Sequence, residues 1–465
     1  MKLIRDNIYG GLPGIIRTPV SFLWGNIPQS IKYGKTYRSY QHLLERSQWW
    51  TKEKHERYQV GKMREIVAYA KEHVPYYRKI FEDVGIGAHD IRGVEDIQKI
   101  PFTEKDIFIS KGTAMLSDEY RMSDLLVKTT SGTSGKQLRM YTLPKAYEKR
   151  EIPFVNTIWG RVGYVPGKSR VVRMRNEGFK EGSLWRYNYL TKELVIDTYH
   201  LTDMNIGRIL DKMSKWKGEF LHIYPSTAMI LCDYIQRRKI PYHSDLKAVL
   251  VTSENLYPGQ KEIIEECMGA RCFTFYGHSE CAGIAGWCEE SDLYHIQSEY
   301  GYMELIDEKG NVIQEPGKIG EIVCTGFDNY VMPFIRYRTE DYASYAEERF
   351  CSCGRHYKLL KRIEGRRTQE MFIGKDGNRI ALTAINMHSD IFRNVKNYQF
   401  VQDIPGRCVL RVVRADGYSE NDEEMIQREV TKKFGSSVEV SISYVAQIER
   451  QKSGKQKFFV QNIKG

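Results

Sequence analysis

Apolar residues in the segment 40–88 recur at the spacing of a helix. Met63, Ile66 and Val67 fall on one helical face, which predicts an amphipathic helix packed on the rest of the protein. Pro75 cannot continue a helix, so we expect a break there and a second helix from Tyr76 onward. The N-terminal part of the chain is therefore predicted to be helical.

The middle of the chain alternates short apolar runs with helical patterns. The predicted strands are 170–174, 221–224, 248–252 and 271–276, and helices are predicted from about 145, at 227–239 and at 257–268. Such alternation predicts a largely parallel sheet with covering helices. Because ligands gather beyond the carboxyl ends of parallel strands, the turns after Tyr224, Thr252 and Tyr276 are candidate site positions.

The pattern changes after Tyr302, where short strands at 303–307 and 320–324 predict a β-rich subdomain. Beyond a polar junction at 365–368, predicted strands and helices alternate in a small α+β domain: strands at 370–373, 407–413 and 437–444, and helices near 383–393 and 421–434. The predicted fold class is α/β, with a large N-terminal domain and a small mobile C-terminal domain. The predicted divisions are 1–125 (helical extension), 126–364 (core with the β-rich subdomain) and 365–465 (α+β lid).

Two polar stretches interrupt these elements. Residues 101–106 predict a loop in which Thr103 caps a short helix. Residues 129–136 read Thr-Thr-Ser-Gly-Thr-Ser-Gly-Lys, and the glycines allow the backbone N–H groups to approach an anion while the hydroxyls and Lys136 add donors. The spacing does not match a Walker A motif. The loop suits a polyphosphate, and a plain surface turn is the alternative.

The composition and charge of the chain exclude some classes of function. The chain has 465 residues, a hydrophobic fraction of 41% and a net charge of +11, as expected for a soluble protein of two or three domains. The basic residues are scattered, which argues against nucleic acid as a partner. No run approaches a membrane span of about 20 apolar residues. We expect a cytoplasmic protein.

The first 35 residues mix basic with apolar side chains and show no clean signal peptide. Two interpretations remain: packing on the body of the protein, or weak contact with the inner, anionic face of a membrane. The oligomeric state is not readable from the sequence.

The nine cysteines form no disulfide framework, but four residues suggest a metal. Cys351 and Cys353 form a tight pair, and Cys288 and His295 lie seven positions apart on an earlier segment. Three thiolates and an imidazole make a tetrahedral structural zinc site. Buried free thiols are the alternative.

Five motifs in order resemble the acyl-adenylate-forming superfamily. They are the Ser/Gly loop, residues 276–280 (Tyr-Gly-His-Ser-Glu), 338–341 (Arg-Thr-Glu-Asp), 365–366 (Gly-Arg) and 453–455 (Ser-Gly-Lys). Within this superfamily, residues 73–77 and 101–106 are typical of the phenylacetate–CoA ligase-like branch. Members of that branch often have cysteine and histidine at the positions that match the four candidate zinc ligands. Residues 294–296, 329–337 and 386–390 look like its capsular-polysaccharide-associated subgroup. The resemblance covers residues 40–465.

The resemblance implies roles for individual residues. The residues that would bind the β- and γ-phosphates of ATP are those of the loop: Thr130, Ser131, Gly132, Thr133, Ser134, Gly135 and Lys136. Glu280 would hold Mg²⁺, and Ser279 would contact the α-phosphate. The other nucleotide-binding residues would be Asp341 on the ribose, Ser253 and Glu254 beside the adenine, and Tyr276, Gly277 and Arg366, the last at the domain junction. Tyr224, Pro225, Ser226 and His278 would border the carboxylate substrate, and Lys455 would reach the carboxylate and α-phosphate.

The sequence also departs from the family pattern. Ser279 stands where Thr is usual, and Glu340 where Gly is usual. The hinge usually carries an Asp near the Gly-Arg pair, whereas Glu370 is the only acidic residue that follows closely here. The pivot residue is therefore left unassigned.

The resemblance implies an enzyme that uses ATP and Mg²⁺ to activate a small carboxylic acid as an acyl-adenylate and passes the acyl group to CoA, with positioning and electrostatics dominating catalysis. Two alternatives stay open. One is transfer to an amine or sugar in the biosynthesis of capsular or other surface polysaccharide. The other is a non-catalytic nucleotide-binding scaffold.

Overall fold

In the computed structural model, the described residues are 25–463 except 131–137, 176, 178, 180–182, 200, 243, 255, 257–258, 365–370, 382–389, 393 and 449–458. Within them, a sheet of 13 strands runs through the larger part of the molecule in the order β12-β11-β13-β14-β15-β10-β9-β8-β7-β6-β3-β5-β4. Its strands are β3 (Val171–Arg175), β4 (Trp185–Asn188), β5 (Glu193–Asp197), β6 (Phe220–Ile223), β7 (Ala248–Val251), β8 (Arg271–Gly277), β9 (Ile284–Gly286), β10 (Tyr294–Ile296), β11 (Gly301–Ile306), β12 (Val312–Ile313), β13 (Ile319–Gly326), β14 (Tyr337–Tyr345) and β15 (Leu359–Glu364).

One half of this sheet is parallel, as the alternating pattern predicts. Strands β5, β3, β6, β7 and β8 all pair in parallel, and only the edge strand β4 runs against its neighbour. These strands are rich in buried Val, Ile, Leu and Phe, because both faces of such a sheet are covered. The mixed α/β fold class is confirmed.

Strand β8 joins the two halves. It pairs in parallel with β7 on one side and antiparallel with β9 on the other. From β9 onward all pairings of the sheet are antiparallel, so the β-rich region predicted after Tyr302 is a continuation of the same sheet. The residues directly after β8 therefore lie where the parallel and antiparallel halves meet.

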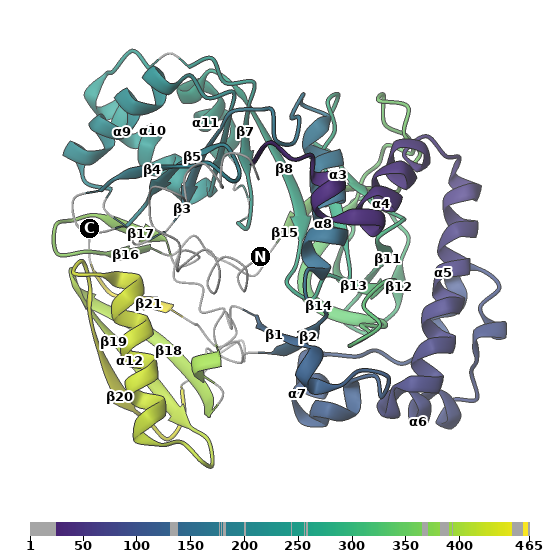
Figure 1. Ribbon diagram of the computed structural model, residues 1–465. Coiled ribbons are helices and arrows are strands. Elements are labelled where there is room, and N and C mark those ends of the chain that lie inside the picture. The colour runs from purple at the N-terminus through teal and green to yellow at the C-terminus, as the bar shows by residue number, and fades with distance from the viewer. Residues whose placement is uncertain are drawn as a thin grey trace.

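Helices cover the parallel half (Figure 1). They are α8 (Ala146–Gly160), α9 (Asp203–Trp216), α10 (Pro225–Arg238) and α11 (Gln260–Met268). On α8, Phe154, Ile158 and Trp159 join the core of the parallel strands. The Trp159 ring meets the His222 ring of β6 at 5.0 Å, so the C-terminal end of α8 lies over the body of the sheet.

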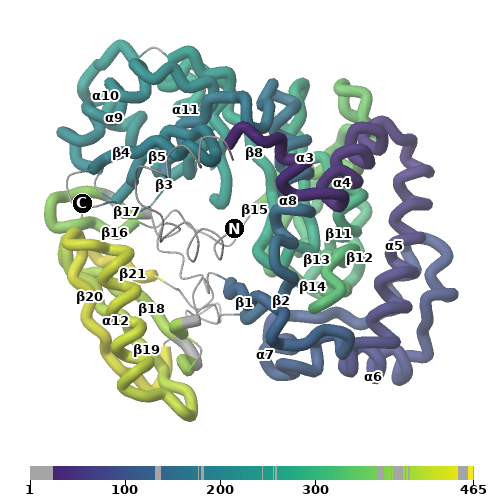
Figure 2. Tube along the Cα trace, in the orientation of Figure 1, coloured from purple at the N-terminus to yellow at the C-terminus, as the bar shows by residue number. Residues whose placement is uncertain are grey.

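The N-terminal helices lie at the opposite side of the molecule from α9 and α10 (Figure 2). They are α3 (Gln29–Lys32), α4 (Gly34–Ser47), α5 (Lys52–His73), α6 (Pro75–Asp83) and α7 (Lys105–Lys111), with 3₁₀ turns at Ala88–Asp90, Val94–Lys99, Gly112–Met115 and Met122–Asp124. The first two pack on α8, and the later ones pack on the antiparallel half. Met63, Ile66 and Val67 are fully buried in the core that contains Leu305 and Ile322. The helical prediction for this segment is confirmed, including the break at Pro75.

The predicted helix cap at Thr103 is wrong. The short helix α7 has Glu104 at its N-cap and no side-chain capping bond. Thr103 instead forms an isolated parallel bridge with Tyr337, and its hydroxyl donates to the Ile335 carbonyl at 2.8 Å. A buried Thr in a bridge to a strand was favoured over a cap because the segment docks on the sheet.

The C-terminal part forms a separate sheet, drawn in green to yellow in Figure 1. Its order is β20-β19-β18-β21, with β18 (Val395–Ile404), β19 (Arg407–Arg414), β20 (Glu439–Tyr444) and β21 (Phe459–Gln461). Helix α12 (Glu420–Phe434) covers it, and β16 (Met371–Ile373) and β17 (Arg379–Ala381) form a hairpin. The Asn378 side chain donates to the Tyr199 carbonyl at 2.7 Å, which ties the hairpin to the larger part.

Two predictions for this region meet the limits of the described residues. Most of the helix predicted near 383–393 lies outside them, and only a 3₁₀ turn at Asp390–Phe392 is seen. The junction residues 365–370 lie outside them as well, so the domain boundaries stay a prediction. None of the described helices is both long and apolar enough to cross a membrane.

Candidate active site

The turns after β6 and β7 meet at the carboxyl edge of the parallel strands. Glu254 accepts hydrogen bonds from the backbone N–H and the hydroxyl of Ser226, both at 2.9 Å. Ser253 has a φ of +68°, an uncommon conformation for a residue with a side chain, which indicates that the turn is held by its surroundings. Ser226 opens α10 after Tyr224 and Pro225, so two of the candidate turns are joined by one carboxylate.

The end of β8 is joined to β14. The Tyr276 hydroxyl donates to Asp341 at 2.9 Å, and the Asp341 N–H donates to the Thr339 hydroxyl at 3.1 Å. Glu340, between them, has a φ of +59°. That backbone conformation explains why a glycine would suit position 340 and why Glu is the strained choice there. The bond from Tyr276 thus holds Asp341 beside the third candidate turn.

Glu280 follows the same turn and is the most constrained carboxylate there. It accepts from the Tyr337 hydroxyl at 2.9 Å and from His278 Nδ1 at 3.1 Å. Burial disfavours its charge, but the hydrogen bond and charge of His278 outweigh that effect and hold the carboxyl pKa well below its usual range. For His278, burial is likewise outweighed, by its contacts with Cys324 and Glu280, and its pKa is raised. Glu280 is therefore held as an anion.

Ser279, between these two residues, is exposed at the surface of the turn, as is Gly277. An exposed hydroxyl beside an ionised, hydrogen-bonded carboxylate leaves room for a ligand next to both. Sequence reasoning chose Glu280 and Ser279 but missed Tyr337, although it stands directly before the Arg-Thr-Glu-Asp motif.

The base of the Ser/Gly loop is a short hairpin of β1 (Leu126–Thr129) and β2 (Arg139–Thr142). Thr130 N–H donates to the Leu138 carbonyl, and the Leu138 N–H donates to the Thr130 hydroxyl, both at 3.0 Å. These two hydrogen bonds hold Thr130 and Leu138, the residues that flank the loop, next to each other. The loop residues Ser131, Gly132, Thr133, Ser134, Gly135 and Lys136, and also Arg366 and Lys455, lie outside the described residues, so their predicted roles stay predictions.

A second cluster lies on the antiparallel side of β8. Cys288, His295, Cys351 and Cys353 offer ligand atoms that all lie within 4.8 Å of one another. The Sγ atoms of Cys288 and Cys351 are 3.5 Å apart, and Cys353 Sγ lies 3.3 Å from His295 Nε2. Two ligands of a tetrahedral zinc ion at about 2.3 Å stand about 3.8 Å apart, so the donor set and the spacing fit that metal.

The histidine of this cluster is oriented by its other ring nitrogen. His295 Nδ1 lies 3.1 Å from the Leu293 carbonyl, which can only accept, so Nδ1 carries the proton. Nε2 then presents its lone pair toward Cys353. Metal-bound histidines are commonly fixed by such a bond to a carbonyl. The cluster is thus arranged for ligation without any rearrangement of the imidazole.

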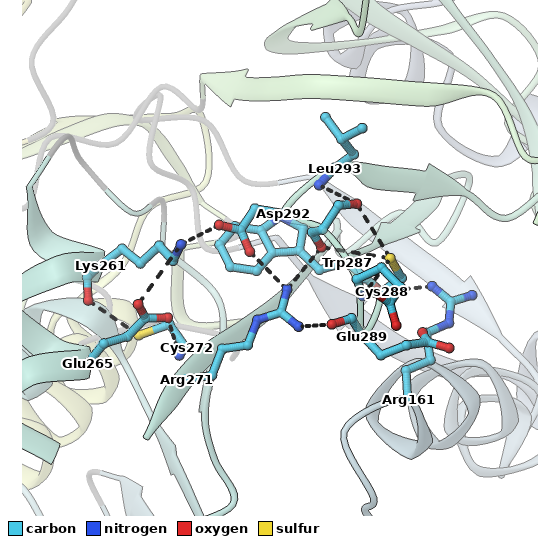
Figure 3. Close-up of polar contacts among 12 residues, drawn as sticks. Arg161, Lys261, Glu265, Arg271, Cys272, Trp287, Cys288, Glu289, Asp292 and Leu293 are labelled. Carbon is cyan, nitrogen blue, oxygen red and sulfur yellow. Dashed lines mark hydrogen bonds and ion pairs between the residues drawn. The ribbon is translucent and has the colours of Figure 1, made fainter. Parts of the chain in front are cut away.

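The loop that carries Cys288 is anchored by cations from neighbouring elements (Figure 3). Arg271, at the start of β8, donates to the Glu289 and Ser291 carbonyls at 2.6 and 3.0 Å and to Asp292 at 2.9 Å. Lys261 of α11 also pairs with Asp292, and Arg161 donates to the Trp287 carbonyl at 2.8 Å. This network was not predicted, because nothing in the local sequence links Arg271 to a loop some 20 residues later.

The mixed α/β fold, with ionisable groups at the edge of the parallel strands and a separate C-terminal sheet, is shared with solved structures. The 2-hydroxyisobutyryl-CoA ligase, solved with 2-HIB-AMP and CoA in the thioesterification state, matches with a TM-score of 0.58 at 20% identity, over 90% of this chain and 92% of that one. At that identity the likeness bears on the fold.

Comparison with known sequences shows which ligases this chain resembles. Residues 372–462 match the model of the CapK C-terminal domain. The chain is 26% identical to the phenylacetate-coenzyme A ligase of Thermus thermophilus over 431 residues, covering 85% of this chain and 94% of that one. It is 25% identical to the protein CapK of Staphylococcus aureus over 415 residues, covering 86% and 88%. These findings confirm the resemblance to the phenylacetate–CoA ligase-like branch, and they support an adenylate-forming, CoA-ligase-like enzyme.

Proposed function

We propose that this protein is an AMP-forming ligase that activates a small carboxylic acid with ATP and passes the acyl group to CoA. The observation that carries the proposal is the pair of carboxylates at the junction of the two sheet halves. Glu280, in the turn after β8, is held ionised by Tyr337 and His278, and Asp341 of β14 is held by Tyr276 at the end of β8. This is where an α/β sheet binds its ligands.

Each carboxylate suits a different part of ATP. Glu280 would hold Mg²⁺, which prefers carboxylate and phosphate oxygens, and that ion would neutralise phosphate charge when bound. Asp341 would accept hydrogen bonds from the ribose hydroxyls. The turn of Ser253 and Glu254 would border the adenine, and the exposed Ser279 hydroxyl would face the α-phosphate.

The remaining parts of the proposal rest on residues outside the described set. The Ser/Gly loop with Lys136, whose flanking residues Thr130 and Leu138 are hydrogen-bonded to each other, would hold the β- and γ-phosphates. Lys455 would come from the C-terminal domain to the reacting carboxylate. Both lysines supply positive charge where the transition state concentrates negative charge.

We also propose that Cys288, His295, Cys351 and Cys353 hold a structural Zn²⁺. The four donors are largely buried, and together they would leave no coordination position open. When bound, the metal would tie the loop after β9 to the segment between β14 and β15.

A different acceptor is the second candidate. It is motivated by the resemblance of residues 294–296, 329–337 and 386–390 to the capsular-polysaccharide-associated subgroup, and by the match of residues 372–462 to the CapK C-terminal domain. In that case the acyl group would go to an amine or a sugar of a surface polysaccharide.

The test is pyrophosphate release with ATP, Mg²⁺ and a panel of carboxylic acids, followed by addition of CoA, amines or sugars. Pyrophosphate release that depends on the acid supports the ligase, and the added nucleophile that consumes the adenylate names the acceptor. Absence of release with every acid would favour a non-catalytic scaffold. As a companion measurement, Lys136→Ala should weaken ATP binding about tenfold by calorimetry and leave the melting temperature unchanged, because we expect a lysine in this Ser/Gly-rich stretch to contribute little to stability.

A further inference from the structure

The first turns of α8 extend past the carboxyl ends of the parallel strands. Near its C-terminal end, Trp159 packs on His222 in the middle of β6, and Tyr164, just beyond the helix, packs on Phe220 at the start of β6. The helix therefore runs opposite to the strands. Tyr147 lies 12 positions before Trp159, or about 18 Å along a helix, so it sits beyond the strand ends.

Tyr147 and Glu151 belong to the same face of α8. They are four positions apart and continue the stripe of Phe154 and Ile158, which are fully buried in the core. The stripe thus changes from apolar to polar at the point where the helix leaves the core and reaches the strand ends. A purely structural helix would be expected to end this face in solvent or in further apolar residues.

Tyr147 is accessible and at the same time surrounded by protein. It exposes 48% of its surface, yet burial raises the pKa of its phenol to about 12. Glu151 adds to this rise, and Arg175 opposes it. The ring is also close to Lys128, whose Nζ lies 5.3 Å from its centroid. The carboxylate of Glu151 and the guanidinium groups of Arg175 and Arg173 act on the same hydroxyl there.

The two charged residues have unused bonding capacity. Glu151 accepts a hydrogen bond from the Tyr300 hydroxyl at one oxygen, and its second oxygen has no partner among the described residues. The neighbouring Arg150 is used elsewhere, by Asp328 at 3.4 Å and the Tyr300 carbonyl at 3.2 Å. Arg175, the last residue of β3, has neither an ion pair nor a hydrogen-bonding side-chain partner in the described part of the chain.

By contrast, Arg173, two residues earlier on β3, is paired with Glu193 of β5. Among the described residues, Arg173 is therefore neutralised by an ion pair and Arg175, at the carboxyl end of the strand, is not. Burial also raises the pKa of Glu151, which allows its carboxyl either to accept or to donate a hydrogen bond.

We propose that Tyr147, Glu151 and Arg175 line the acyl end of the carboxylate site and select an acid that carries hydroxyl groups. A hydroxyl donates to Glu151 and accepts from Arg175 or Tyr147, so one kind of substituent satisfies all three. An ammonium would suit Glu151 but would be repelled by Arg175 and by Lys128, whose Nζ lies 5.3 Å from the Tyr147 ring centroid, and a second carboxylate would suit those two cations but would be repelled by Glu151. The inference rests on the proposed ligase function and adds the substrate class to it.

An unsubstituted aryl or alkyl acid fits this lining poorly. It would displace water from Glu151 and Arg175 without replacing the lost hydrogen bonds, and unpaired polar groups are costly. Sites built to bond a substrate hydroxyl discriminate strongly against analogues that lack it. Phenylacetate should therefore be a poor substrate for this protein.

The experiment compares kcat/KM for pyrophosphate release between matched acids. The pairs are phenylacetate with its ring-hydroxylated forms, and hexanoate with polyhydroxylated six-carbon acids. The wild-type protein should favour the better hydroxylated acid of a pair by about 10² or more. Tyr147→Phe and Glu151→Met should each reduce that ratio at least tenfold, mainly by lowering turnover of the hydroxylated acid, while ATP affinity measured by calorimetry stays unchanged.

Glu148→Gln is the matched control, because Glu148 lies on the same helix and its charge acts on Tyr33 instead. It should leave the ratio unchanged. Equal use of hydroxylated and unsubstituted acids by the wild type, or an unchanged ratio in both variants with melting temperatures near that of the wild type, would overturn the inference and leave the ligase function standing. No pyrophosphate from any acid would overturn the proposed function itself, and the inference with it.

Discussion

Residues 278–295 contribute side chains to two clusters of ionisable groups, and the two clusters differ in how far they are exposed to solvent. In the carboxylate cluster after β8, the side chains of His278 and Glu280 keep 9% and 12% of their surface exposed, and the neighbouring Ser279 is open. In the thiol–imidazole cluster, Cys288 and His295 are completely buried.

This difference in solvent exposure indicates a different role for each cluster. A cluster that supplies four ligands and no open position suits a structural metal, whereas a catalytic site keeps a position for substrate or water. The carboxylate cluster lies at the carboxyl edge of parallel strands, where a ligand can reach it. We therefore expect changes in the first cluster to affect catalysis and changes in the second to affect stability.

The largest effect is expected from Glu280→Gln. The variant keeps the side-chain shape but loses the charge that would hold Mg²⁺, so the rate of pyrophosphate formation should fall by about 10² to 10³. Its melting temperature should stay close to that of the wild type. Glu290→Gln, on the exposed loop beyond, is the control for a change of charge. A large loss of stability with full activity would reverse the assignment of the two clusters.

Lys455→Ala tests the proposed catalytic role further, because the adenylation and acyl-transfer half-reactions can be assayed separately. If Lys455 meets the carboxylate and α-phosphate only during adenylation, pyrophosphate formation should fall by about 10². Consumption of a supplied acyl-adenylate with CoA should change much less, because the C-terminal domain can rotate between steps. Equal losses in both assays would show that this lysine is not the adenylation lysine, and Lys452 or Lys457 would be examined next.

Cys351→Ser tests the other cluster. Loss of one thiolate should lower zinc content measured by elemental analysis and reduce the melting temperature by roughly 5 °C or more, since zinc ligation contributes on the order of 10 kcal/mol in small domains. Activity per folded molecule should change little. Cys408→Ser, at a buried thiol of the C-terminal sheet, is the matched control and should retain zinc. Wild-type protein that contains no zinc when purified without chelators would refute the metal site.

The smallest effect concerns acid stability next to the thiol–imidazole cluster. His55 of α5 packs against Tyr357, with ring centroids 4.7 Å apart, and is 3% exposed, and burial lowers its pKa to about 4. The unfolded chain binds a proton near pH 6.5, so this contribution to stability is complete above that pH and is lost as the pH falls toward 4.

Relative to His55→Phe, the wild-type melting temperature should therefore fall by roughly 2 °C over this window. His89→Gln, at a histidine whose side chain is 84% exposed, should follow the wild-type profile. Parallel profiles for the wild type and His55→Phe would contradict the assignment.

Much of the local structure was predictable because it depends on periodicity. The stripe of Met63, Ile66 and Val67 specifies a buried helical face whatever it packs against. The apolar runs before Tyr224, Thr252 and Tyr276 predicted parallel strands, and the structure has β6, β7 and β8 there. Strand β18 was missed, since its polar residues obscure the alternation expected of a strand.

What the sequence determined by itself is therefore the set of elements, the strand-end turns and the residue types available at them, including the tight pair of Cys351 and Cys353. The tertiary structure decided which of these residues meet. Tyr337 reaches Glu280 across 57 positions, and Arg271 holds the loop of Cys288 because β8 and that loop lie side by side. Strand pairing sets such contacts, and pairing depends on how the whole sheet buries its apolar faces, which no local pattern contains.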